Sequence, residues 1–179
     1  MPFLENQEFI DRYRFNEPWD SPHNRALAHG IPHGMNPNYP IYHCPSDRDS
    51  DKWDTSYVMV VGPGTISDGP TSRSLDQCPN GPSRTIMIVE MSESGIHWME
   101  PRDLKFDQMS FKINDPGGGG IRSKHRGGAM IVFGDGDQRF IHATEDPELV
   151  KDLLAGKRSK RAGEFFQRFG WDSPPPGAP

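Results

Sequence analysis

The sequence predicts an α+β fold: a small, mainly antiparallel sheet with an N-terminal helix, a C-terminal helix and long Gly/Pro-rich loops. A hairpin pattern around Asp135-Gly136 predicts the sheet. Amphipathic spacing near each end of the chain predicts the two helices. The chain has 19 Gly and 18 Pro, whereas Leu, Ile, Val and Phe make up only about a fifth of its 179 residues. This composition predicts the long loops and a thin core.

The hairpin pattern is the clearest local signal. Residues 129–133 form a continuous apolar run, Asp135-Gly136 follows, and a second strand-like run ends at Ile141. Asp-Gly between two β-prone runs predicts a type I′ turn, which needs positive φ at both central positions. The uninterrupted apolar run predicts an inner strand that is covered on both faces.

Three further strands complete the expected sheet. Residues 55–61 and 85–91 are rich in β-branched and other apolar side chains, and residues 96–99 form a shorter run. The four residues 92–95 contain a glycine, so we expect the second and third of these strands to pair as an antiparallel hairpin. Residues 18–54, 62–83 and 114–128 are interpreted as loops because Pro, Gly, Asn and Ser dominate them.

Helices are expected at both ends of the chain. The apolar residues of segment 3–15 recur at three- and four-residue spacing, and Pro18 ends that segment. Near the C-terminus, Asp146 is suited to cap a helix and Pro147 to begin it, while Gly156 marks its end. One face of this helix carries Leu149, Val150, Leu153 and Leu154. Residues 101–108 are expected to form a helical turn, since Pro101 suits its first position.

The chain is interpreted as one globular domain over residues 1–156, followed by a tail over residues 157–179. The tail begins with basic and aromatic residues, in which one more docked helix is conceivable, and it ends in a Pro-rich segment. The formal net charge of −5 and the lack of a broad basic surface exclude nucleic acid as an expected partner. The sequence contains neither a signal peptide nor an apolar run of about 18 residues.

The hairpin segment also carries a family resemblance. His125, nine intervening residues and Asp135-Gly136 match the His-x(9)-Asp-Gly signature of the prepilin-type-processing-associated domains, a large family of pilin-like secreted proteins of unknown function. The resemblance extends over most of residues 1–155, where further segments follow one another in the same order as in the family. These segments are 16–24, Cys44-Pro45-Ser46-Asp47, 56–58 with Gly62-Pro63-Gly64-Thr65, 84–90, and 98–104. Their order and spacing make the resemblance specific. In the turn, Gly134-Asp135-Gly136-Asp137 replaces the usual Ala-Asp-Gly-Ser.

The resemblance implies that residues 1–156 form the soluble, non-catalytic head of a pilin-like protein of the type II secretion pseudopilin kind. Such a head is expected in the periplasm or at the cell surface, with the proteins of a pilin-like assembly or a cell-surface ligand as partners. Family members normally begin with a prepilin leader and a long apolar helix, whereas residues 1–7 resemble a segment downstream of that helix. Either the anchor lies outside this sequence or the protein is a variant without it. Membrane attachment is therefore expected only through such a helix.

The secreted location that the resemblance implies bears on the two cysteines. Cys44 and Cys78 each begin a Cys-Pro dipeptide in a loop, and an oxidising compartment favours their pairing. Such a disulfide would contribute on the order of 3–4 kcal/mol by the chain-entropy argument. The alternative is a pair of buried thiols. A structural zinc site is not expected, because two isolated cysteines supply only half of its ligands.

Calcium is the one candidate cofactor. Asp47, Asp49 and Asp51 occupy every second position, as in the opening of a calcium loop. Asp135 and Asp137 flank the turn glycine. The helix-loop-helix calcium motif is excluded, since its sixth and twelfth positions are Lys52 and Val58 instead of Gly and Glu. A looser site remains open because calcium requires only clustered oxygens. The competing interpretation is turn formation and solubility.

Two further functions compete with the non-catalytic assembly role. The first is an extracellular calcium- or carbohydrate-binding module whose loops 18–54 and 62–83 form the site. The second is a hydrolase that uses His125 with Glu90 or Asp103 as a general acid/base pair. A local structural role for His125 is the favoured interpretation, because a histidine without a nearby nucleophile is more often a satisfied polar group than a catalyst.

Overall fold

The computed structural model describes residues 7–29, 41–68, 74–78 and 80–170. The chain divides into two compact units, of which the first contains residues 1–56 with 92–102 and the second contains residues 57–91 with 103–179. The Pro-rich end of the chain and the apolar residues before position 7, which were expected to begin the N-terminal helix, lie outside the described residues.

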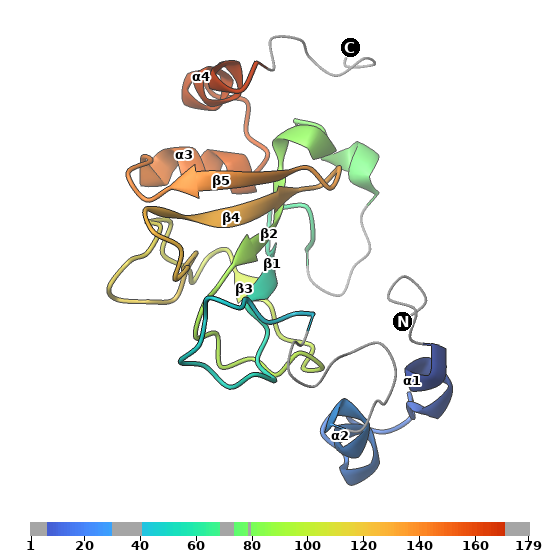
Figure 1. The fold of residues 1–179 in the computed structure, drawn as a ribbon. Helices are drawn as coiled ribbons and strands as arrows, with labels where there is room; N and C mark the ends of the chain where they lie inside the picture. Colours follow the sequence, from blue (N-terminus) through green and yellow to red (C-terminus); the bar gives the residue numbers. More distant parts are fainter. Residues whose placement is uncertain (1–6, 30–40, 69–73, 79, 171–179) are drawn as a thin grey trace. The chain divides into compact units, whose positions relative to one another are not determined.

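The second unit contains a five-stranded mixed sheet with the strand order β3-β1-β2-β4-β5 (Figure 1). The strands are β1 (Tyr57–Val61), β2 (Ile86–Glu90), β3 (Leu104–Lys105), β4 (Gly128–Phe133) and β5 (Gln138–His142). Neighbouring strands are antiparallel except β1 and β3, which are parallel. The predicted α+β class with a small, mainly antiparallel sheet is therefore confirmed.

Strands β4 and β5 form the predicted hairpin, with Ala129 opposite Ile141 and Val132 opposite Gln138. The predicted type I′ turn is wrong, because Gly136 has a φ of 90° while Asp135 is not among the residues with positive φ. The Gly136 N–H donates to the Phe133 carbonyl at 2.9 Å, which closes a three-residue loop that ends in a left-handed glycine. In this turn only Gly136 has a left-handed backbone, so Asp135 avoids a conformation that is unfavourable for residues other than glycine.

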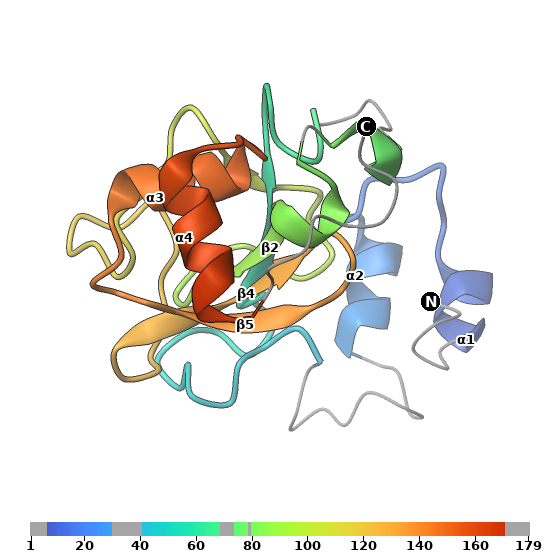
Figure 2. The same ribbon diagram turned by 90° about the horizontal axis from the view of Figure 1, so that it is seen from above.

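Two helices of the second unit, α3 (Pro147–Leu154) and α4 (Lys160–Arg168), lie on one face of the sheet (Figures 1 and 2). Helix α3 is the predicted C-terminal helix, and Asp146 caps it by accepting the Glu148 N–H at 3.0 Å. Helix α4 falls in the range expected to be a tail. Its Phe165 and Phe166 are buried, so this part of the tail belongs to the packed core of the unit.

In the first unit, α1 spans Gln7–Arg12 within the described residues, so the predicted N-terminal helix ends at Arg12 and not at residue 15. The interpretation of residues 18–54 as loop is wrong in part, because α2 spans Pro22–His29. The Ser21 hydroxyl accepts the Asn24 N–H at 3.2 Å, and Pro22 occupies the first turn. Both features are ordinary signals of a helix start, but the surrounding prolines obscured them.

Two other predictions of local structure are corrected. Residues 96–99 do not pair with β2, because both edges of β2 are occupied by β1 and β4. They belong to the first unit, where His97 forms an isolated bridge with Asp54. The helical turn expected over residues 101–108 is correct only in its last part: Leu104–Lys105 form strand β3, which pairs with β1 at Val60–Leu104, and a turn closed by the Gln108 N–H and the Lys105 carbonyl follows. The described residues of segment 62–84 include two short 3₁₀ turns, Leu75–Gln77 and Pro82–Arg84.

None of the helices in the described parts of the chain has the length and apolar character that a membrane span requires.

Asp115 organises the glycine-rich loop that precedes β4. Its carboxylate accepts hydrogen bonds from the Ser110 hydroxyl and, at 3.1 Å, from the Gly117 N–H. The hydrogen bond from Ser110 contributes most, and together with that from Gly117 it holds the pKa of the Asp115 carboxyl below its usual value. A carboxyl group with a lowered folded-state pKa stabilises the protein above its unfolded-state pKa, and the stabilisation is lost as the pH falls through the folded-state value.

Asp115→Asn is therefore expected to lower the Tm slightly at pH 7, and the difference from the parent is expected to shrink as the pH falls below about 4, the ordinary value of an unfolded aspartate, and on through the lowered folded-state pKa. Thermal melts followed by circular dichroism at several pH values measure this. Asp107→Asn, at a nearby exposed position, is the matched control and should leave the pH dependence of the Tm unchanged. A Tm difference for Asp115→Asn that stayed constant down to pH 2 would contradict the assignment.

Candidate functional site

The candidate site lies around strand β4. The residues of the His-x(9)-Asp-Gly signature lie before and after this strand in the sequence. His125 precedes the first residue of β4, and Asp135-Gly136 follows its last residue. On the neighbouring strand β2, Glu90 is the last residue. The His125 Nε2 atom lies 3.5 Å from Glu90 Oε1. Of the two carboxylates considered as partners of His125, the structure thus places Glu90 beside it.

An ordered loop brings His125 to this position. The Arg122 N–H donates to the Glu90 carbonyl at 3.0 Å, which aligns the loop with the end of β2. The Ser123 N–H donates to Asn114 Oδ1 at 2.8 Å, and the Ser123 hydroxyl accepts the His125 N–H at 2.9 Å. These contacts fix the backbone on both sides of residue 124. The sequence offered no signal for the roles of Ser123 and Asn114, because both partners act on backbone groups.

Glu90 is an unusual residue for the interior of the sheet. Its side chain is only 1% exposed, whereas that of His125 is 40% exposed. One carboxylate oxygen, Oε2, accepts the Met130 N–H of β4 at 2.9 Å. The last paired residues of β2 and β4 are Val89 and Ile131, so the carboxylate satisfies the next backbone donor beyond the ladder. Glu90 Oε1 accepts no hydrogen bond from the described residues.

Asp103, the other candidate carboxylate, has a different role. It accepts the Met59 N–H of β1 at 3.2 Å, next to the edge strand β3. Desolvation raises the pKa of its carboxyl group. Its contact is with β1, so the geometry supports Glu90 and not Asp103 as the carboxylate paired with His125.

The aspartates of the hairpin take part in turn chemistry. Asp135 Oδ1 accepts the Asp137 N–H at 3.0 Å, and the Asp137 carboxylate pairs with the Arg139 guanidinium at 2.9 Å. Both contacts are local and stabilise the turn that Gly136 completes. Calcium binding by these two residues is not tested by the geometry and stays a prediction.

The Cys-Pro-Ser-Asp segment forms a turn in the first unit whose two end residues, Cys44 and Asp47, are buried. The Asp47 N–H donates to the Cys44 carbonyl at 2.9 Å, and the Cys44 N–H donates to the Ser56 hydroxyl, also at 2.9 Å. Asp47 Oδ2 accepts the Glu93 N–H at 2.9 Å and the Ser56 hydroxyl at 3.3 Å. Asp47 therefore joins three stretches of the first unit. The sequence did not reveal Ser56 as its partner.

The four aspartates proposed as calcium ligands and the two cysteines proposed to form a disulfide are divided between the two units. Asp49, like Asp47, belongs to the first unit, whereas Asp135 and Asp137 belong to the second. Cys44 and Cys78 are both buried and lie in different units. A calcium site built from these aspartates and a disulfide between the cysteines both stay predictions.

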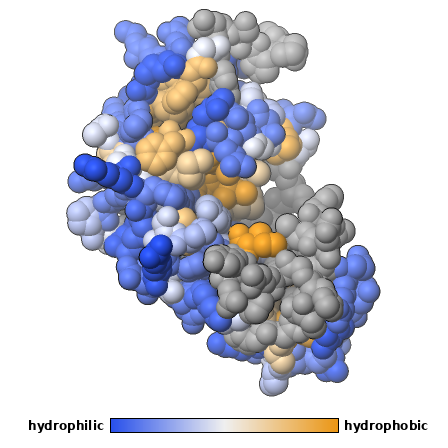
Figure 3. All heavy atoms as spheres, in the orientation of Figure 1, coloured by the Kyte–Doolittle hydropathy of each residue, from blue (hydrophilic) through white to orange (hydrophobic). Residues whose placement is uncertain are grey.

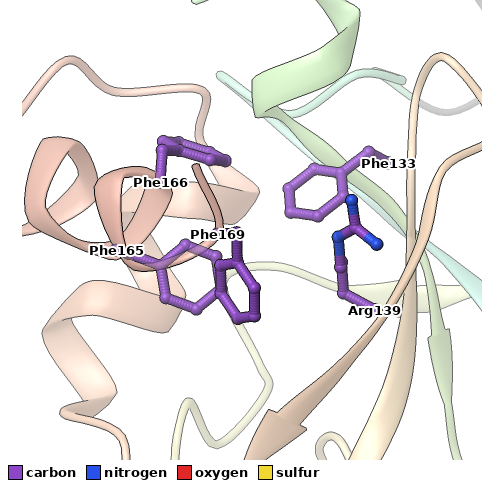
Figure 4. Close-up of a pocket in the computed structure, with 5 residues that line it drawn as sticks. All are labelled: Phe133, Arg139, Phe165, Phe166 and Phe169. Carbon is purple, nitrogen blue, oxygen red and sulfur yellow. The ribbon is translucent and has the colours of Figure 1, made fainter. Parts of the chain in front are cut away.

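An aromatic cluster lies on the helix-covered face of the sheet. The Phe133 ring and the Arg139 guanidinium project from the sheet toward Phe165, Phe166 and Phe169 of the α4 region (Figure 4). Arg139 lies 5.9 Å from the centroid of Phe169, a cation–π distance. In Figure 3, apolar atoms reach the otherwise mostly hydrophilic surface in the part that holds α4 and the hairpin. The cluster attaches α4 to the sheet.

The first part of the chain matches a known protein family. Residues 1–112 match the family described as "Protein of unknown function (DUF1559)". The chain belongs to this family. The matched range ends before His125, so it includes the Cys-Pro-Ser-Asp turn and Glu90 but not the His-x(9)-Asp-Gly signature. Searches of curated proteins and of solved structures found no match.

Proposed function

We propose that this DUF1559 chain is the non-catalytic head of a pilin-like protein of the type II secretion pseudopilin kind. It works in assembly or display in the periplasm or at the cell surface. Its partners are other proteins of that assembly. The proposal combines the resemblance of the signature segment to the prepilin-type-processing-associated domains with the positions of the signature residues around β4.

The observation that carries the proposal is that the signature spans one structural unit. The nine residues between His125 and Asp135 contain all of β4, from Gly128 to Phe133. Before the strand, His125 lies against Glu90 of β2, and after it Gly136 closes the turn to β5. A spacing set by the length of a strand is what a structural motif requires. This supports a role in holding the sheet together instead of a role in chemistry.

Cell fractionation of the source organism tests the proposal. A chromosomally tagged copy of the protein is expected in the periplasmic or surface fraction, together with pilin-like proteins that shearing or membrane solubilisation releases. A tagged cytoplasmic protein in the same cells controls for leakage. Retention of the tagged protein in the cytoplasmic fraction would contradict the assembly role.

Hydrolysis is the second candidate function, and the 3.5 Å approach of His125 Nε2 to Glu90 Oε1 is the observation that favours it. A buried carboxylate beside a half-exposed imidazole is an arrangement that general-base catalysis uses. Under this alternative, the purified protein would hydrolyse activated esters, and His125→Gln would remove that activity while His142→Gln, an exposed β5 histidine, would not. Equal background rates for the parent and both variants would eliminate hydrolysis of such esters.

A further inference from the structure

The distance between His125 and Glu90 is informative in itself. A charge-assisted hydrogen bond between an imidazole and a carboxylate would bring N and O to about 2.7–2.9 Å. The observed Nε2–Oε1 distance is 3.5 Å. Two ligands of a tetrahedral zinc ion, each about 2.0–2.2 Å from the metal, are about 3.4 Å apart. The pair is therefore too far apart for the hydrogen bond and matches the spacing of two atoms that share one metal ion.

The environment of Glu90 supplies a second, independent argument. Its side chain is 1% exposed, and Oε1 accepts no hydrogen bond from the residues that the structure describes. A buried carboxylate oxygen without a donor is costly, and such oxygens are usually compensated by a cation or a hydrogen bond. The other oxygen is fixed by the Met130 N–H at 2.9 Å. This bond holds the carboxylate in place with Oε1 directed toward His125, as an outer-shell contact orients a metal ligand.

We propose that Glu90 Oε1 and His125 Nε2 are two protein ligands of a divalent transition-metal ion of the zinc class. The 40% exposure of His125 gives the ion a route from solvent, and water or further donors complete its coordination. An imidazole–carboxylate set suits zinc or cobalt and disfavours calcium, which prefers an all-oxygen shell. The ion would join the end of β2 to the segment that leads into β4. The proposal is independent of the assembly role.

No short-range motif in the sequence signals this site. Its two ligands come from distant parts of the chain, and only the adjacency of β2 and β4 brings them together. Three basic residues flank the histidine: Arg122, Lys124 and Arg126. Of these, Lys124 and Arg126 are exposed, so solvent screens their repulsion of the ion.

The test uses the untagged, full-length protein, stripped of metal with a chelator and titrated with zinc chloride by calorimetry. We expect one equivalent of zinc to bind and the Tm to rise, since a ligand of the native state stabilises it. Cobalt in place of zinc should give the absorption bands of a tetrahedral nitrogen–oxygen site.

Three variants make the assignment specific. His125→Gln and Glu90→Gln should each weaken zinc binding at least tenfold and remove the tetrahedral cobalt bands. Glu90→Gln retains a side-chain acceptor for the Met130 N–H. His142→Gln, which removes an exposed imidazole from β5, is the matched control and should bind zinc like the parent.

Two results would overturn the proposal: no zinc binding by the parent at 100-fold molar excess, or equal binding by His125→Gln and the parent. If Glu90→Gln does not fold, His125→Gln still decides, because His125 is half-exposed and outside the strands. These outcomes concern metal binding by the purified protein, so they are separate from the outcome of cell fractionation.

Discussion

Phe133→Ala is expected to lower the free energy of unfolding by about 3–5 kcal/mol, the usual cost of removing a buried phenylalanine. The side chain of Phe133 is 0% exposed, and its ring lies 5.9 Å from that of Phe166. The substitution leaves a cavity between β4 and α4, the two elements whose rings meet in Figure 4. Urea denaturation followed by circular dichroism measures the change through the transition midpoint at constant slope.

Phe169→Ala is the matched control, because it removes the same side chain from the rim of the same cluster. Phe169 is 42% exposed, and its contact with Arg139 is a cation–π distance of 5.9 Å. We expect a smaller loss of about 1–2 kcal/mol, because the partly exposed ring gives up a cation–π pair with Arg139 and an edge contact with the Phe165 ring, 5.0 Å away, without leaving a closed cavity. Equal losses for the two variants would mean that α4 does not depend on the buried rings.

The hairpin was predictable because its signal is local. An apolar run, a turn with Gly136 and a second short run are contiguous in the sequence, and β4 and β5 pair as expected. Only the turn type was wrong, since Asp-Gly also suits a loop in which the glycine alone is left-handed. Helix α3 was predictable for the same reason, because Asp146 and Pro147 mark its start within two residues.

The partners of β2 could not be predicted from local signals. The short segment 92–95 favoured a hairpin with residues 96–99, but β2 pairs with β1 and β4 instead. Strand pairing is decided by the apolar surface that each neighbour covers, and no pattern within residues 85–99 contains that information. The same limit explains why α2 was missed among prolines that are typical of loops.

The candidate site was predictable in its residues but not in its geometry. His125, Asp135 and Gly136 were identified by their spacing, and Glu90 was one of two carboxylates considered for His125. The choice between Glu90 and Asp103 depends on strand order, because β1 separates β2 from the edge strand that follows Asp103. The burial of Glu90 and the Met130 N–H bond are likewise consequences of the sheet.

Gly128→Ala should be the most disruptive single-methyl change in the hairpin, with an expected loss of about 3 kcal/mol or more from overpacking. Gly128 pairs with His142 at the start of β4. A Cβ atom there would collide with the Ile141 carbonyl oxygen and lie 2.7 Å from the Phe140 ring. The backbone oxygen cannot move without breaking the β4–β5 ladder, so the clash is not relieved by a rotamer change. Chemical denaturation of the purified variant measures the loss.

Gly163→Ala provides the matched control, because it adds the same methyl group where the fold has room. Gly163 lies within α4, and a Cβ atom there would meet nothing within 4 Å. Alanine in a helix interior is favoured over glycine by about 0.5–1 kcal/mol, so this variant should be more stable than the parent. Opposite signs for the two Gly→Ala changes are expected only if β4 and β5 approach as closely as described. A neutral Gly128→Ala would contradict that close approach of β4 and β5.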